Sequence, residues 1–503
     1  MLTHIFQGFA VTLAPVNLLW IVAGTAVGLI LGAFPGLDST VGAALFIPVT
    51  YAMSPTVALV FLVGMYGGAV YGGQIPAILF RIPGAPEAVM TTLDGYPMAQ
   101  KGQADRALGL GLFYSVFGNI FGGLCLLFLA PALAAMALQF GPSEYFALGF
   151  LGMTAMAGLG GKSPIKSLIS GLFGLLIATV GMDQITGMER FTFGRLELAN
   201  GVGFIPVVIG LFALAEVLNQ TVKQGITGTV AEAAVSKEEM KRLRIRLPSW
   251  AEVKSFKWIS LGTALIGTWI GVLPGVGATT AAIVGYSQTA RLSKDPEKFG
   301  TGDPRGIVAS ETSNNAAVGG AMVPLLALGI PGSATTAVML GAFMLHGLKP
   351  GPLLMVEQAQ MAYASMASVI VSALAFLGLA LIMVRPFIRL LGLPYPVVAA
   401  GIVAFCAVGA LSMGDLFGLY LAIGFALLSF LMDKGGFPTS PIILGMVLGP
   451  IMESSFRRAL IISDNVWGVI TEPITAFLLI LSLVSLFAPT LLGKGRKNHA
   501  SQE

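Results

Sequence analysis

Long hydrophobic stretches separated by short polar loops run through most of the chain. Between residues 107 and 161 there is no Lys or Arg, and Glu144 is the only acid. Because one membrane crossing takes about 20 apolar residues, this stretch has room for two crossings. Further hydrophobic stretches lie at residues 18–34, 56–79, 202–221, 363–384, 416–432 and 466–491. The pattern predicts an all-α polytopic membrane protein with roughly 10–14 membrane segments.

Proline–glycine pairs interrupt the hydrophobic stretches at matching places in the two halves of the chain. The spacing G-x3-G-x2-P-G occurs at residues 28–36 and again at 267–275, an offset of 267 − 28 = 239. Ile-Pro-Gly occurs at 82–84 and at 330–332, an offset of 331 − 83 = 248. We call these four breaks the elbows: Pro35-Gly36, Pro83-Gly84, Pro274-Gly275 and Pro331-Gly332. Since two motifs recur in the same order at nearly the same offset, we predict two inverted structural repeats with broken helices or re-entrant hairpins.

The duplication and the distribution of charge divide the chain into five parts. These are an N-terminal interfacial segment (1–17), a first membrane repeat (18–222), a basic cytoplasmic linker (223–257), a second membrane repeat (258–492) and a polar tail (493–503). The linker carries eight Lys or Arg against four acids, and basic loops stay on the cytoplasmic side. Inverted halves with this linker place the N-terminus outside, whereas the basic tail favours the inside. An extra final crossing, such as 466–491, would reconcile the two.

Composition supports the membrane assignment and gives little support to other classes. The 503 residues are 55% hydrophobic and only 10% charged, whereas soluble domains carry about a quarter charged residues. The net charge of +4 comes from basic loops, so it indicates orientation rather than nucleic-acid binding. Cys125 and Cys406 lie in apolar runs and indicate no disulfide framework. We expect no bound cofactor and no transition-metal site.

The elbows are the candidate binding elements. A broken helix leaves backbone N–H and C=O groups unpaired, and within a membrane this is tolerated only where they line a cavity or bind something. Half-helix N-termini attract carboxylates, and unwound carbonyls attract Na⁺. Simple kinks are the alternative, and hydroxyls beside them often bond back to the i−4 carbonyl. The polar run 310–315, which contains Glu311, is either functional or a loop that caps the following helix.

Several motifs resemble the large membrane subunit of the tripartite tricarboxylate transporters. The longest is the run from Asn314 to Met339, and residues 71–73, 82–84 and 93–98 match a first-half motif. The resemblance covers roughly residues 18–450. It implies a cation-coupled importer of carboxylates such as citrate in a bacterial inner membrane. It also implies two partners, a small membrane subunit and a periplasmic solute-binding protein that delivers the ligand.

With this resemblance, the elbow residues divide into two predicted sets. The predicted substrate-binding residues are Arg81, Pro83, Gly84, Pro331, Gly332, Ser333, Thr335 and Thr336. The predicted ligands of the coupling cation, Na⁺ or alternatively H⁺, are Gly36, Asp38, Ser39, Thr40, Gly275, Gly277, Thr279, Thr280, Asn314 and Asn315. Arg81 would clamp a substrate carboxylate, or else it is an interfacial arginine that reaches to water.

Two other functions compete with this prediction. A stand-alone ion-coupled symporter would need no binding protein, and no feature of the sequence separates the two. A membrane-embedded enzyme is disfavoured because the chain has three scattered His and contains neither H-E-x-x-H nor G-x-S-x-G.

Overall fold

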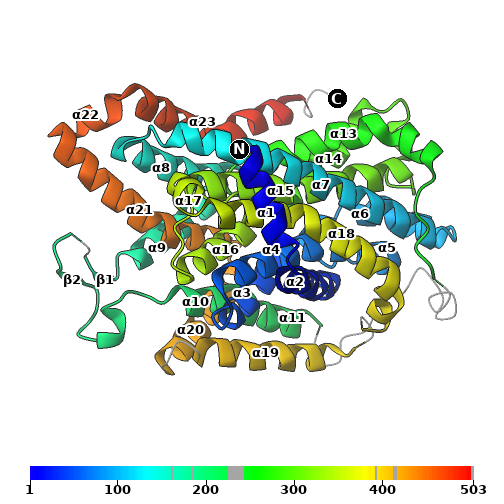
Figure 1. Ribbon diagram of the computed structural model, residues 1–503, viewed down its shortest axis with the longest axis horizontal. Coiled ribbons are helices and arrows are strands. Elements are labelled where there is room, and N and C mark those ends of the chain that lie inside the picture. Colours follow the sequence, from blue (N-terminus) through cyan, green and yellow to red (C-terminus); the bar gives the residue numbers. More distant parts are fainter. Residues whose placement is uncertain (160–162, 184, 225–242, 391–392, 412–415, 500–503) are drawn as a thin grey trace.

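The computed structural model describes residues 1–159, 163–183, 185–224, 243–390, 393–411 and 416–499, and these are mostly helical (Figure 1). The first half contains α1 (Leu2–Thr12), α2 (Pro15–Ala33), α3 (Ser39–Thr50), α4 (Pro55–Gly72), α5 (Gln74–Phe80), the short turn η1 (Pro86–Ala88), α6 (Thr91–Gln100), α7 (Ala104–Ala137), α8 (Pro142–Leu159), α9 (Pro164–Ala178), β1 (Gly181–Met182), β2 (Glu189–Arg190), the turn η2 (Leu196–Leu198), α10 (Phe204–Val208), the π-helical segment η3 (Ile209–Leu214) and α11 (Ala215–Gln224). The second half contains α13 (Trp250–Val272), α14 (Gly277–Leu292), the turn η4 (Pro296–Lys298), α15 (Pro304–Leu328), α16 (Ala334–Leu345), α17 (Pro352–Glu357), α18 (Ala359–Leu390), α19 (Tyr395–Leu411), α20 (Leu416–Lys434), α21 (Ser440–Ser463), α22 (Val466–Thr471) and α23 (Pro473–His499). The antiparallel strands β1 and β2 were not predicted and add two short strands to the α-helical fold.

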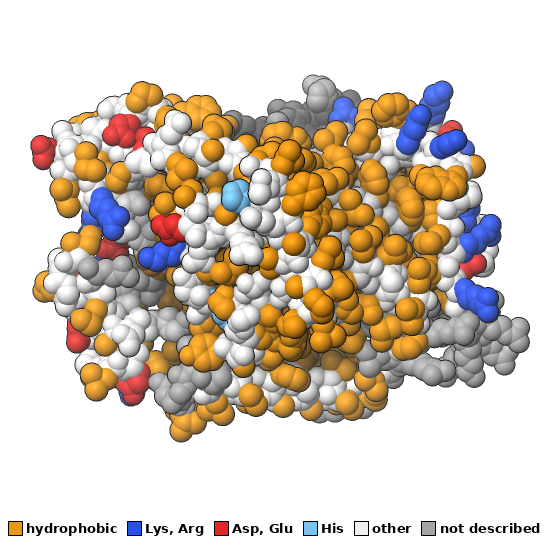
Figure 2. Space-filling model, viewed as in Figure 1, with side chains coloured by type: hydrophobic (Ala, Val, Ile, Leu, Met, Phe, Trp, Pro, Cys, Tyr) orange, Lys and Arg blue, Asp and Glu red, His pale blue; other side chains and the backbone are white. Residues whose placement is uncertain are grey.

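The helices have the length and surface of membrane-spanning elements. Six helices of the described chain are long and apolar enough to cross a membrane, and five shorter apolar helices accompany them. Figure 2 shows a mainly hydrophobic face, with the charged side chains gathered at the two ends of the long axis. These observations confirm an α-helical membrane protein. The number of crossings, roughly 10–14, stays a prediction.

One helix pair is packed in the same way in both halves of the chain. A Cβ added at Gly32 of α2 would lie 2.0 Å from the carbonyl oxygen of Ala69 in α4, and one at Gly271 of α13 would lie 2.6 Å from that of Ala317 in α15. These positions are related by 271 − 32 = 239 and 317 − 69 = 248, the two offsets of the sequence motifs. Glycine permits this close approach of membrane helices. The duplication therefore extends to the packing, while the inversion of one half relative to the other stays a prediction.

The elbows break the helices with matching backbone conformations. Gly36, between α2 and α3, has φ 90°, and Gly275, between α13 and α14, has φ 75°. Arg81 after α5 and Gly329 after α15 have φ 59° and 73°, and their positions differ by 329 − 81 = 248. A positive φ favours glycine because it lacks a Cβ. The proline–glycine spacing therefore marks real ends of helices rather than kinks within them.

Helix α15 lies at the centre of the molecule and carries the polar run. It contacts α7, α13 and α14, and every residue from Gly306 to Ala327 is buried. In Figure 1, α19 and α20 lie along one side of the molecule and α22 and α23 along the opposite side. The run 310–315 is inside α15 rather than in a loop before it, so the alternative that it is a capping loop is wrong.

The predicted end segments and linker are partly helical. The interfacial segment forms α1, which packs on α18, and the hydroxyl of Thr12 donates to the carbonyl of Ala364 at 3.0 Å. At the described end of the linker, the N–H of Arg246 donates to the carbonyl of Asp105 in α7 at 3.1 Å. Helix α23 continues to His499, so the tail begins as helix.

Candidate functional site at the elbows

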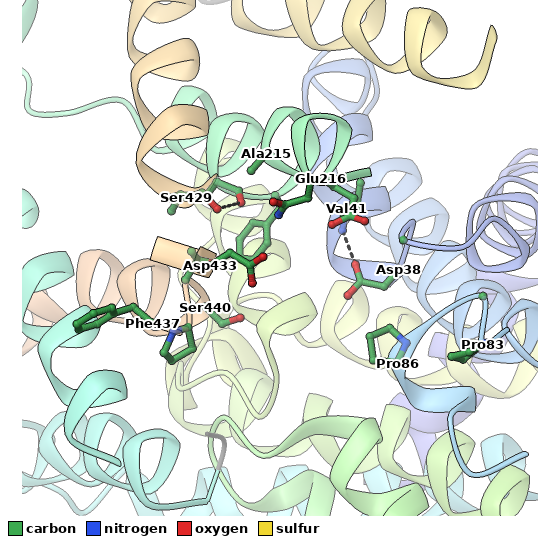
Figure 3. Close-up of a pocket in the computed structure, with 17 residues that line it drawn as sticks. Asp38, Val41, Pro83, Pro86, Ala215, Glu216, Ser429, Asp433, Phe437 and Ser440 are labelled. Carbon is green, nitrogen blue, oxygen red and sulfur yellow. Dashed lines mark hydrogen bonds between the residues drawn. The ribbon is translucent and has the colours of Figure 1, made fainter. Parts of the chain in front are cut away.

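Two cavities adjoin at the elbows. The elbow cavity, about 290 Å³, lies at the starts of α3, α14 and α16. The α20 cavity, about 440 Å³, lies between the first-half elbows and η3, α11 and α20 (Figure 3). Asp38, Phe212, Pro438 and Ser440 line both cavities. Figure 3 shows Asp38 on one side of the α20 cavity, with Asp433 and Ser440 across from it.

The elbow cavity brings together predicted site residues from both halves of the chain. Its lining includes Asp38, Thr40, Gly275, Gly277, Thr279, Thr280, Ser333 and Thr335. The lining of the α20 cavity includes Gly36, Pro83 and Gly84. The described linings do not include Arg81, Ser39, Asn314, Asn315, Pro331, Gly332 or Thr336. Residues predicted for the substrate and for the cation thus share one cavity.

Hydroxyl groups join the two halves at this cavity. The Oγ1 of Thr335 in α16 lies 2.7 Å from the Oγ of Ser39 and 3.1 Å from the Oγ1 of Thr40 in α3. Across the cavity wall, the hydroxyl of Tyr66 in α4 lies 3.2 Å from the Oγ of Ser333. Tyr66 was not predicted, because it lies within a hydrophobic stretch and far from the elbows in sequence. These contacts place several hydroxyl oxygens around one space.

Three helices begin at the elbow cavity, and they differ in how their first N–H groups are satisfied. At α3, one carboxylate oxygen of Asp38 accepts two backbone N–H groups, at 2.8 and 2.9 Å. At α16, Ser333 and Thr336 cap each other's backbone N–H. The start of α14 has no side-chain cap, and Gly277 stands there at the position equivalent to Asp38 (277 − 38 = 239). Uncapped N–H groups and the positive end of the helix dipole favour an anion at α14.

The two cavities are acidic. Asp38 and Glu87 line the elbow cavity, and Asp38, Glu216 and Asp433 line the α20 cavity. Neither lining, as far as the chain is described, contains a Lys, Arg or His. An anion entering this space would meet carboxylates without a basic side chain to offset them, so its binding calls for a positive charge from elsewhere.

Glu87, on η1, is the charged residue of the elbow cavity that the sequence reasoning missed. Its side chain is buried, and its Oε1 accepts the Ser39 hydroxyl at 3.4 Å. Its Oε2 has no hydrogen-bond partner within the described structure. The repeat offset could have found it, since 335 − 87 = 248 places Glu87 at the position equivalent to Thr335.

A buried polar cluster on α15 lies beside the cavity. Glu311 accepts a hydroxyl from α6, the hydroxyl of Ser115 in α7 at 2.9 Å and the Nδ2 of Asn314 at 3.4 Å. The same Nδ2 lies 3.2 Å from the main-chain oxygen of Glu87, to which it donates. Asn315 donates to the Oδ1 of Asn314 at 2.8 Å, and its own Oδ1 has no partner in the described part of the chain. The cluster therefore touches the backbone of η1 rather than the cavity itself.

Arg81 lies away from both cavities. Its side chain is exposed, and its guanidinium lies over the ring of Tyr96, 5.8 Å from the centroid. This placement fits an arginine that reaches to water. The structure does not bring it to the helix starts where a carboxylate would bind.

Comparison with known proteins identifies the family. Residues 18–444 match the family model described as "Tripartite tricarboxylate transporter TctA family". The chain belongs to this family. The resemblance drawn from the motifs is thereby confirmed, and membership of a transporter family fits a protein that is not an enzyme.

Two relatives of the TctA family chain come from Agrobacterium vitis. One is the "Uncharacterized 52.8 kDa protein in TAR-I ttuC' 3'region", 36% identical over 488 residues, which are 96% of this chain and 95% of the relative. The other is the "Uncharacterized protein in TAR-II ttuC' 3'region", 37% identical over 227 residues, which are 45% of this chain and 94% of the relative. No solved structure matches the chain.

Proposed function

We propose that this chain is the large, transporting subunit of a secondary-active importer of tricarboxylates or related carboxylates in a bacterial inner membrane. It works with a small membrane subunit and receives its substrate from a periplasmic solute-binding protein. A gradient of Na⁺, or alternatively of H⁺, drives uptake. Family membership supports the class of protein, and the uncapped start of α14 at the elbow cavity supports an anionic substrate.

The uncapped start of α14 is the observation that carries the proposal. At the equivalent helix start in the first half, that of α3, a carboxylate oxygen of Asp38 accepts two backbone N–H groups. A helix start at this place in the repeat therefore binds a carboxylate. In the second half glycine stands at this position, and the first residues of α14 line a cavity of about 290 Å³. We propose that a substrate carboxylate takes the place of the missing side chain at Gly277, Thr279 and Thr280, three residues that the sequence pattern assigns to the cation.

The acidic lining supports coupling to a cation. A substrate with two or three carboxylates would be repelled by Asp38 and Glu87 unless a cation entered with it. Broken helices supply carbonyl and hydroxyl oxygens, which are the ligands that hard cations take. Asn314 and Asn315 lie behind the cavity lining, on the backbone of η1, and remain proposed cation contacts there, since the buried Oδ1 of Asn315 has no partner among the described residues.

Reconstitution tests this function directly. The large and small subunits are placed in liposomes, and uptake of labelled citrate and related carboxylates is followed with the solute-binding protein outside and an inward Na⁺ or H⁺ gradient. We expect accumulation of unchanged substrate that needs the gradient. Uptake without the binding protein would favour the stand-alone symporter, and conversion of the substrate would favour an enzyme.

A further inference from the structure

We propose that Glu87, together with Asp38, binds a Na⁺ ion at the elbow cavity, and that this ion binds before the carboxylate. Nothing in the sequence motifs assigns a role to Glu87, which lies between two motifs. The inference rests on the proposed function for the order of binding. The ion site itself depends only on the geometry around Glu87.

Glu87 is a buried carboxyl group with unused binding capacity. Glu87 is 7% exposed, and the hydrogen bond that its side chain accepts from Ser39 is long at 3.4 Å. Its Oε2, in the structure as described, has no hydrogen-bond partner although the residue lines the elbow cavity. An ionised carboxylate offers about four acceptor sites, and leaving them unpaired in a buried place is unfavourable. Oε2 is therefore a buried acceptor without a partner on a residue that lines the elbow cavity.

The described residues around the elbow cavity supply no positive charge to offset Asp38 and Glu87. The described lining of the elbow cavity has no Lys, Arg or His. The nearby buried cluster on α15 brings only amide and hydroxyl groups and a further acid, Glu311. A mobile cation fills this role without a permanent basic partner.

The oxygens around Glu87 suit Na⁺ better than a proton. Ser39, Thr40 and Thr335 form a chain of hydroxyl contacts at 2.7 and 3.1 Å, and Ser39 joins this chain to Glu87. Asp38 lines the same cavity and holds the start of α3 in place. A proton needs a single acceptor, whereas a hard cation takes several oxygen ligands from carboxylates, hydroxyls and carbonyls. The set contains two carboxylates and three hydroxyls.

The order of binding follows from the charges on the two sides of the cavity. The start of α14 attracts a carboxylate, while Asp38 and Glu87 repel it across the same cavity. Na⁺ at Glu87 reduces this repulsion and adds an attraction, so the loaded cavity binds the anion more tightly than the empty one. By linkage, the bound carboxylate then raises the Na⁺ affinity by the same factor.

Thermal unfolding of the purified large–small subunit complex tests the site. Na⁺ is supplied as NaCl without carboxylate, and choline chloride keeps the ionic strength constant. We expect NaCl to raise the Tm of the wild type and choline chloride to leave it unchanged. In Glu87→Gln, we expect the NaCl concentration for half of the shift to rise at least tenfold. Glu144→Gln is the matched control, because Glu144 accepts the N–H of Gly141 at 2.8 Å and lines neither cavity, and it should respond as the wild type does.

Three results would overturn the ion site. The first is an equal rise of the Tm in choline chloride, and the second is an unchanged NaCl response in Glu87→Gln. The third is a Tm that depends on pH but not on NaCl, with this pH dependence lost in Glu87→Gln. If Glu87→Gln does not fold, Glu87→Asp replaces it, since it keeps the charge but draws it back by one methylene. If Glu87→Asp reached half of its Tm shift at the same NaCl concentration as the wild type, this result would contradict the site.

Citrate added to the same samples tests the order and separates the two proposals. We expect citrate to raise the Tm in NaCl and not in choline chloride. Stabilisation by citrate in choline chloride would overturn the order. A NaCl shift that Glu87→Gln removes, with no effect of any di- or tricarboxylate, supports the ion site and counts against the proposed substrate class.

Discussion

Replacing Gly277 by Asp should place a carboxylate at the start of α14, as Asp38 does at the start of α3. In α3 the N-cap Asp38 accepts two backbone N–H groups, and the repeat offset matches it to Gly277, the first residue of α14 after the N-cap Val276. An ideal Cβ at Gly277 would have one neighbour within 4 Å, the Cβ of Ser333 at 3.4 Å, so the cavity has space for a side chain. The new carboxylate would occupy the N–H groups that we propose for the substrate.

The expected loss can be worked out from the interactions that the new side chain would replace. A hydrogen bond to a charged group contributes about 1.5–3 kcal/mol, and a charge at a helix N-terminus about 0.3–1 kcal/mol. Together these give about 2–4 kcal/mol, or a loss in substrate affinity of roughly 30- to 1000-fold. The positive φ of 72° at Gly277 adds strain of about 1–2 kcal/mol for any other residue, which lowers stability rather than binding.

Two control variants separate the cap from the strain. Gly277→Ala carries the strain alone, and Gly277→Asn adds a neutral cap. Uptake of labelled citrate into proteoliposomes across a concentration series gives the KM of each. We expect the KM to rise in the order Ala, Asn, Asp. A Gly277→Asp protein with a KM within about threefold of Gly277→Ala would refute binding of the substrate at α14, because the predicted loss is at least tenfold larger.

Three further variants probe the elbows, the cation and the loop after α9. Gly275→Leu should abolish uptake while the protein remains in the membrane, because φ 75° disfavours any side chain and a leucine would add bulk at the lining of the elbow cavity; retained uptake would show that this elbow is not needed for transport. Asn315→Ala should raise the Na⁺ concentration for half-maximal uptake roughly 5- to 150-fold, as for loss of a ligand worth about 1–3 kcal/mol, and an unchanged Na⁺ dependence would remove Asn315 from the cation contacts. Backbone N–H groups and Arg457 lower the pKa of Asp183 below its ordinary value, so the ionised side chain stabilises the fold above about pH 4 and this contribution is lost as the pH falls further. Asp183→Asn should therefore lower the Tm at pH 7, with a smaller difference at lower pH, and equal Tm values at pH 7 would contradict this role.

The features that could be predicted from the sequence are those with a strict local requirement. Proline ends a helix and glycine permits a positive φ, so the elbows left a readable spacing at Gly36 and Gly275. Hydrophobic length marked the helices, because the lipid thickness fixes how many apolar residues a crossing needs. The close packing of α2 on α4 and of α13 on α15 also follows from glycines at the same offsets.

The features that could not be predicted depend on how the two halves meet. Glu87 belongs to the site because η1 of the first half packs against α14 and α15 of the second, and no local pattern around Glu87 encodes that contact. Arg81 is near an elbow in sequence, yet its side chain points to the ring of Tyr96 at the exposed surface. Residues predicted for the cation and residues predicted for the substrate line the same elbow cavity. This could not be predicted, because the spacing of motifs along the chain gives no distances between the two halves.

The position of the bound carboxylate tests the central claim most directly. An electron cryo-microscopy structure of the large–small subunit complex with citrate in NaCl would show it. We predict a citrate carboxylate within hydrogen-bond distance of the first N–H groups of α14, at Gly277 to Thr280, inside the elbow cavity. Citrate bound elsewhere, with the start of α14 free or held by another side chain, would contradict the account.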